Sequence, residues 1–291
     1  MKNTKEIKIA FSVCIVLSLI IGSIILLNVK AIPKYTHLVD SGIQIKELVL
    51  EMKLQANSYL LYHQEDVPDN VKDKIIKLRK VLSLYEKTSF AEKPEELFEF
   101  PIWEEAINIY ERLFDQLVLY HEVVDKNITE IRDLEKNILA VIYSKMNPER
   151  GIIALQEIRI NEKGYIIYRS HPRSPDEISF ENKRKEAVTN LLIWAQDDKR
   201  IDELMSQDNL IFNEITKNYA YLDNTLHALN IEGEKIKNVA ENFSEKGNKG
   251  LYIIYRSCAF FSIILLIVWL IIAIPIAATM LSYKHGLSGK E

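Results

Sequence analysis

Residues 212–243, FNEITKNYAYLDNTLHALNIEGEKIKNVAENF, carry the pattern that decides the fold. Apolar side chains recur here every seven residues, at Ile215, Leu222, Leu229, Ile236 and Phe243. A companion series shrinks along the chain, through Phe212, Tyr219, Leu226, Gly233, Ala240 and Gly247. Two such series on one helix form the seam of a helical bundle, and small residues let helix backbones approach closely. The stretch predicts one long helix whose packing tightens toward its C-terminal end. The alternative is that its last glycines loosen the helix there.

A second stretch with the same spacing lies earlier in the chain. Its apolar positions have gaps that average 3.5 residues: Leu113, Leu117, Tyr120, Val124, Ile128, Ile131, Leu134, Ile138 and Val141. Only six glycines lie between residues 30 and 256, and no strand-like alternation interrupts the helical spacing. The chain is therefore predicted to be all-α.

Turn signals divide the central region into helices. They lie at residues 64–70, 91–94 with 100–101, 147–149, 171–176 and 197–202. Asn147-Pro148-Glu149 has the order of a helix N-cap followed by proline at the first helical position. The predicted helices are 34–63, 71–89, 102–146, 149–170, 176–196 and 202–250.

Two long uncharged runs frame this region, at residues 9–29 and 257–283. A helix crosses a bilayer with about 20 apolar residues, so both runs qualify. A cleaved signal peptide is the alternative for the first run, but its apolar core is too long and no small-residue cleavage site follows. Lys2, Lys5 and Lys8 precede the first run, and Lys284 and Lys290 follow the second. Positive flanks stay in the cytoplasm.

The expected organisation follows from these flanks. Residues 1–8 form a cytoplasmic N-terminus, 9–29 and 257–283 two transmembrane helices, 30–256 an extracytoplasmic region and 284–291 a cytoplasmic tail. Cys14 and Cys258 lie near opposite membrane faces, so no disulfide is expected. A disulfide-free outer region suits the cytoplasmic (inner) membrane of a bacterium.

Composition and motifs exclude several functions. The net charge of −4 argues against nucleic-acid binding. No phosphate-binding loop, catalytic serine motif, zinc motif or cysteine cluster is present, so we expect no enzyme activity, no cofactor and no metal. His63 and His121 have no second ligand at a fixed spacing, and we interpret both as surface residues.

The central region also contains an apparent internal duplication. Residues 51–62, EMKLQANSYLLY, align without a gap to residues 157–168, EIRINEKGYIIY. Three of the 12 pairs are identical and five more are conservative substitutions. The predicted helix lengths repeat as well, in the order medium, short and long. Chance similarity between two amphipathic helices is the alternative.

The segment 155–169, LQEIRINEKGYIIYR, resembles the Arg-x-x-Glu-Lys-x-aromatic signature of the helical bimodular sensor domain. This family occurs in bacterial chemoreceptors and sensor histidine kinases, and the resemblance covers about residues 35–256 in length and helix order. It implies two stacked four-helix bundles built from six helices, two of which span both bundles. Gly164 departs from the signature, because the family has an acidic or polar residue there.

The resemblance further implies a ligand sensor. Some relatives bind small carboxylates, and others engage a periplasmic binding protein. We expect a transmembrane receptor module, working as a homodimer, that senses small organic acids. Only eight residues follow Tyr283, so we expect the output domain to lie outside this chain and Pro275 to begin a HAMP-like linker.

The alternative function is a membrane-anchored helical structural or interaction protein. It would bind a periplasmic protein and no small molecule. A bundle interior lined only by apolar side chains would favour this alternative. A polar pocket holding two Arg or Lys residues would favour the sensor.

An anionic ligand requires fixed positive charge, preferably from arginine. Arg159 lies on the same helix face as Glu162 and Lys163, so these three residues are candidates for ligand binding. An ion pair within the helix is the alternative reading. Lys53 occupies the duplicated position, which places the same polar site once in each module. Further candidates from partner helices are Arg79, Arg112 and Arg132.

Overall fold

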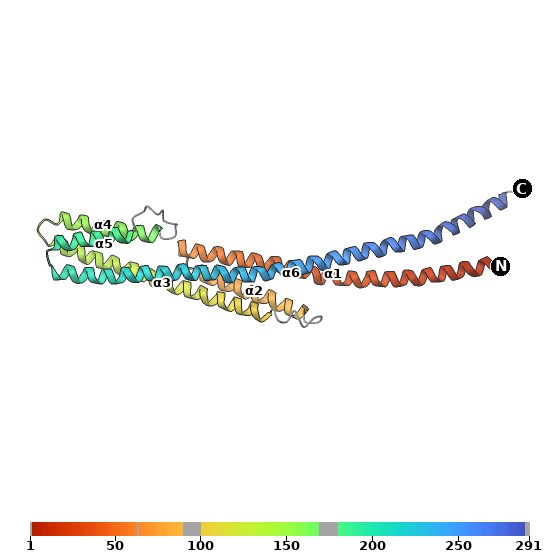
Figure 1. Cartoon of the computed structure of the whole chain (residues 1–291), viewed down its shortest axis with the longest axis horizontal. Coiled ribbons are helices and arrows are strands. Elements are labelled where there is room, and N and C mark those ends of the chain that lie inside the picture. Colours follow the sequence, from red (N-terminus) through yellow and green to blue (C-terminus); the bar gives the residue numbers. More distant parts are fainter. Residues whose placement is uncertain (1, 63, 90–99, 169–179, 289–291) are drawn as a thin grey trace. The chain divides into compact units, whose positions relative to one another are not determined.

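The computed structural model describes residues 2–62, 64–89, 100–168 and 180–288, and within them it contains six α-helices and no strands. The helices are α1 (Lys2–Tyr62), α2 (Val67–Ser89), α3 (Phe100–Tyr143), α4 (Glu149–Tyr168), α5 (Phe180–Ala195) and α6 (Lys199–Ser288) (Figure 1). The all-α prediction is confirmed. Both cysteines are free.

Three helices begin earlier than the sequence patterns predicted. Asp198 caps α6, because its Oδ1 accepts hydrogen bonds from the backbone N–H groups of Arg200 (2.9 Å) and Ile201 (3.3 Å). In α2, Pro68 lies in the first turn, where its missing N–H has no partner within the helix. The turns predicted at 64–70 and 197–202 were therefore too long, and 100–101 belong to α3 instead of a turn. The turns predicted at 91–94 and 171–176 lie outside the described residues.

Helices α1 and α6 each contain a segment long and apolar enough to cross a membrane. Their most apolar 18-residue windows have mean hydropathies of 2.6 and 2.9, and almost none of those residues are buried within the protein (6% and 0%). Each helix continues without a break from its apolar segment into the polar region, with Pro33 inside α1 and Pro275 inside α6. By length and composition these are candidate spans of a two-pass membrane protein.

The chain divides into two compact units. Unit 1 comprises Met1–Gln55, Asp69–Ile109 and Glu232–Glu291, and unit 2 comprises Ala56–Pro68 and Tyr110–Ile231. Four helices build the core of unit 1, because α1, α2, α3 and α6 all contribute fully or almost fully buried apolar side chains. These include Ile45, Met52, Ile75, Leu78, Trp103, Ile107, Ala240 and Phe243.

Glycines bring α1 and α6 close together in unit 1. A Cβ atom on Gly247 would lie 2.8 Å from the carbonyl oxygen of Tyr35, and one on Gly250 would overlap the Tyr35 ring. On the same pair of helices, a Cβ on Gly42 would lie 2.6 Å from the carbonyl oxygen of Ala240. The predicted tightening at the end of the seam is confirmed, and these glycines serve close packing.

The core of unit 2 is also shared by four helices. Its buried apolar cluster takes side chains from all four: Ile138, Val141 and Ile142 from α3, Ala154, Leu155 and Ile158 from α4, Ala187, Val188, Leu191 and Ala195 from α5, and Ile201 and Met205 from α6. Helices α4 and α5 lie side by side (Figure 1). Gly164 has a packing role here, since any Cβ at this position would overlap the ring of Phe180. The absence of a side chain at this position thus admits an aromatic ring against α4.

Candidate functional site

Three charged side chains lie in the interior of unit 2. Glu162 of α4, Arg184 of α5 and Asp208 of α6 are only 4%, 3% and 1% exposed. Each occupies a core position of its helix. Asp208 stands midway between Ile201 and Ile215, seven residues from each, so it extends the apolar series backward. Charged groups at such positions require partners, because burying an unpaired charge is very costly.

Arg184 supplies those partners. Its Nε donates to Glu162 Oε1 (2.6 Å), its Nη1 donates to Asn209 Oδ1 (2.7 Å), and its Nη2 donates to Asp208 Oδ2. The guanidinium also lies over the Phe212 ring, with 4.1 Å between the Arg184 Cζ and the ring centre. All three nitrogens of Arg184 are therefore engaged, and the group joins α4, α5 and α6.

A second ion pair lies between α3 and α4. The Nε of Arg159 is 2.8 Å from Glu135 Oε2, and the two side chains are 29% and 13% exposed. Arg159 was predicted either to bind a ligand or to pair with Glu162 inside its own helix. The structure pairs it instead with a carboxylate of another helix. Glu162 pairs with Arg184 of α5, because position 162 of α4 is buried in the core whereas position 159 lies at the edge of the core.

Burial controls the protonation of the three carboxyl groups. Desolvation raises the pKa of Glu162 to about 8; the nearby charge of Asp208 adds to this effect and Arg184 opposes it. Burial also raises the pKa of Asp208 and that of Glu135, against the lowering effect of their arginine partners. Glu135, Arg159, Glu162, Arg184 and Asp208, hereafter the ionic cluster, thus combine three carboxyl groups with two guanidinium groups.

The other predicted candidates lie elsewhere. In unit 1, Lys53 Nζ donates to Glu234 Oε1 of α6 (2.8 Å), and Arg79 Nη2 of α2 donates to Asn108 Oδ1 of α3 (2.7 Å). The side chains of the remaining three candidates are exposed to solvent: Lys163, Arg112 and Arg132. The structure therefore does not gather the predicted cations into one pocket.

The proposed duplication matches the burial of the two segments. Of the 12 aligned pairs in residues 51–62 and 157–168, only Ser58 and Gly164 differ in burial. Lys53 and Arg159 both pair with a carboxylate of another helix. Glu162, however, aligns with Ala56, so the buried charge has no counterpart at that position. The expectation of the same polar site in each module was wrong on this point.

Sequence reasoning missed Arg184 and Asp208. A signal was present, since Asp208 lies in the seven-residue series and Arg184 lies three and four residues before the buried Ala187 and Val188. The prediction for His121 was also wrong. Its side chain is buried, it packs 5.0 Å from the Tyr59 ring centre, and its Nδ1 lies 3.4 Å from Asp125 Oδ2. His63 lies outside the described residues.

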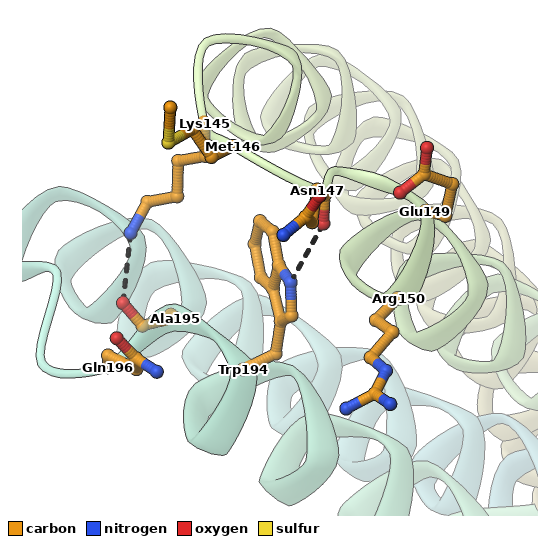
Figure 2. Close-up of a pocket in the computed structure, with 8 residues that line it drawn as sticks. All are labelled: Lys145, Met146, Asn147, Glu149, Arg150, Trp194, Ala195 and Gln196. Atoms are coloured by element: carbon orange, nitrogen blue, oxygen red, sulfur yellow. Dashed lines mark hydrogen bonds between the residues drawn. The ribbon is translucent and has the colours of Figure 1, made fainter.

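Unit 2 also has an open pocket of about 870 Å³ where the α3–α4 and α5–α6 connections meet. Figure 2 shows the Trp194 ring at its centre, and the Trp194 Nε1 donates to Asn147 O (3.2 Å). Lys145 Nζ donates to Ala195 O (2.9 Å) and lies 2.9 Å from Asp198 Oδ2. These bonds join the two connections, so Lys145 and Trp194 hold the helix ends together at this pocket.

Neither a metal-binding arrangement nor a similarity to a known protein assigns a function to the ionic cluster or to the pocket. Among the described residues, no group of three or more His, Cys, Asp or Glu side chains is placed to hold a metal ion. No protein-family model, no curated protein and no solved structure matches the chain.

Proposed function

We propose that the chain is the sensory input module of a two-pass membrane receptor in a bacterial cytoplasmic membrane. In this proposal the region between the spans lies outside the cytoplasm and forms two stacked four-helix bundles. A stimulus received there biases two arrangements of the helices, and the last helix carries the difference into the second span.

One observation carries this proposal. The single helix α6 contains Asp208 of the ionic cluster, core residues of unit 1 such as Phe243, and the apolar segment that is long enough to span a bilayer. A continuous helix transmits translation or rotation along its length, because its backbone hydrogen bonds resist local deformation. A change of packing around Asp208 therefore has a direct mechanical route toward the membrane.

The interior also favours a sensor over a structural spacer. A spacer needs only apolar packing, which is more stable than a buried ion pair in many cases. Unit 2 instead retains two arginines and three carboxyl groups in or beside its core. Both arginines are paired with carboxylates, so a small organic acid would have to displace Glu135, Glu162 or Asp208 to bind there.

A ligand screen tests the sensor proposal. The full chain in lipid nanodiscs is heated with small organic acids, amino acids or amines. A ligand at 100 times its dissociation constant adds about 2.7 kcal/mol to the free energy of unfolding. A saturable shift that disappears in Arg159→Ala or Lys53→Ala but persists in Lys126→Ala, which removes an exposed cation that is not a candidate, would support direct sensing. Capture of an envelope protein with no small-molecule shift would favour the alternative, a membrane-anchored interaction protein.

Topology is tested separately. Cys14 and Cys258 are replaced by serine, and a single cysteine is placed at the exposed position Lys163. A membrane-impermeant maleimide should label this cysteine in spheroplasts. Labelling only after lysis would place the central region in the cytoplasm and refute the receptor orientation.

A further inference from the structure

The ionic cluster of unit 2 has more acidic groups than basic ones. Glu135 comes from α3, Arg159 and Glu162 from α4, Arg184 from α5 and Asp208 from α6. If all five were ionised, the cluster would hold one uncompensated negative charge. Glu162, Arg184 and Asp208 are almost fully buried, so water cannot screen that charge effectively.

Among the residues that the structure describes, no third cation lies inside the core beside these groups. Within the described part of the chain, the charges that act on Glu162 are those of Asp208, Arg184 and Glu135. Those that act on Glu135 are Arg159, Asp208 and Lys163, and the Lys163 side chain is exposed to solvent. Asn209 and Phe212 occupy the remaining sides of the Arg184 guanidinium without adding charge.

We propose that the ionic cluster is a proton-binding site, and that protons are a stimulus of this protein. At neutral pH one carboxyl group of the cluster, Glu162, carries a proton that cancels the excess negative charge. When the pH rises, Glu162 releases the proton to solvent, and two carboxylates then share one arginine. Their repulsion weakens the contacts among α4, α5 and α6. The proton-binding site stands independently of the proposed function, and only its role in signalling rests on that function.

The geometry allows both protonation states. A neutral Glu162 still accepts the hydrogen bond from Arg184 Nε through its carbonyl oxygen, so the observed contact at 2.6 Å survives protonation. Like-charged carboxylates at one site favour retention of a proton by one of them. Glu162 is the candidate because burial and the charge of Asp208 both raise its pKa, to about 8.

The sign of the pH effect follows from linkage. The unfolded chain loses this proton near the ordinary glutamate pKa of about 4.3. The folded protein keeps it until about pH 8. Between these values the folded state binds more protons than the unfolded state, so the free energy of unfolding falls as the pH rises.

Infrared spectroscopy of the full chain in nanodiscs tests the proton directly. We expect the carbonyl stretch of a buried carboxylic acid at pH 7 and its loss above pH 8. Glu162→Gln should abolish the band, because the remaining groups are balanced. Glu157→Gln, which removes an exposed carboxylate of the same helix, should retain it. Absence of the band in the wild-type protein would overturn the inference.

Asp208→Asn provides a second route, since Glu162→Gln could simply fail to fold. This variant also leaves two carboxylates for two arginines, so Glu162 should ionise and the band should vanish. A band that persists unchanged in both folded variants would place the proton elsewhere and overturn the assignment. The melting temperature should fall from pH 6 to pH 9 in the wild type and in Glu157→Gln, and clearly less in Glu162→Gln.

A distance measurement separates this inference from the receptor proposal. Cys14 and Cys258 are replaced by serine, and spin labels are attached at Asp40→Cys of α1 and Asn248→Cys of α6. The distance between the two labels reports on the packing of α1 against α6 in unit 1. A distance that changes between pH 6 and pH 9, but not in Glu162→Gln, supports both proposals. An infrared band with a distance that does not change upholds the proton site and contradicts its signalling role.

Discussion

Removing Arg184 should expose how strongly the interior of unit 2 depends on one cation. Arg184→Leu leaves Glu162, Asp208 and Asn209 without their shared donor, in a region where the two carboxyl groups are almost fully buried. Breaking a buried ion pair from one side costs about 3–5 kcal/mol. We expect a loss in this range at pH 8, because the unfolded chain is fully ionised there and the folded variant must keep Glu162 and Asp208 either charged without a partner or protonated.

Arg184→Leu should lower the free energy of unfolding by less at acidic pH. At pH 5 both orphaned carboxyl groups can take up protons, since their pKa values rise further without Arg184. The remaining cost is then that of unsatisfied neutral polar groups, about 1–3 kcal/mol. Replacing Glu162, Arg184 and Asp208 together by leucine should recover most of the loss at pH 8, because no buried charge then remains.

Urea unfolding at the two pH values measures these costs. Trp194 lies in unit 2, so substituting Trp103 and Trp269 by phenylalanine makes its fluorescence a local probe. Arg132→Leu, an exposed arginine of α3, is the matched control and should change stability by no more than about 0.5 kcal/mol. A loss for Arg184→Leu below about 1 kcal/mol at pH 8, or an equal loss at both pH values, would refute the buried-charge reasoning.

Two glycine substitutions test the close packing in each unit. Gly247→Ala should lower stability by about 1–3 kcal/mol despite the better helix propensity of alanine, because its Cβ would meet the backbone oxygen of Tyr35. Thermal unfolding checks this against Gly22→Ala, whose Cβ meets nothing within 4 Å; equal melting temperatures would contradict the close approach. Gly164→Ala should cost about as much through the ring of Phe180. Adding Phe180→Leu should then restore part of the stability, and failure to do so would mean that the ring is not the obstacle.

The helices of the fold could be predicted from local sequence patterns. Seven-residue spacing at Ile215, Leu222 and Leu229 predicts a long packed helix, because one side of a helix must be apolar to be buried. Uncharged runs of sufficient length predict the candidate spans on composition alone. Helix starts were less accurate, as at Val67 and Lys199, since turn-forming residues such as proline and aspartate also occupy first turns and caps.

The residues of the ionic cluster could be predicted from the sequence only in part. Glu162 was singled out, but its partner was sought in Arg159 of the same helix and not in Arg184 of the next one. Spacing within a helix shows which residues share a face, whereas it does not show which residue of another helix meets them. Asp208 lies seven residues before Ile215, one repeat ahead of the series that was recognised, and that spacing was the available signal.

The sequence by itself determined the helical class, the two apolar segments and the small-residue seam of α6, because these follow from periodicity and hydropathy along one chain. Only the tertiary structure decided which charges are buried and how they pair. The pairing of Arg184 with Glu162 and Asp208 depends on the rotation and register of three helices that are remote in sequence. It is this arrangement that holds Glu162 and Asp208 against the Arg184 guanidinium away from water, beside the partly exposed pair of Glu135 and Arg159, and so makes the protonation of Glu162 a property of the fold.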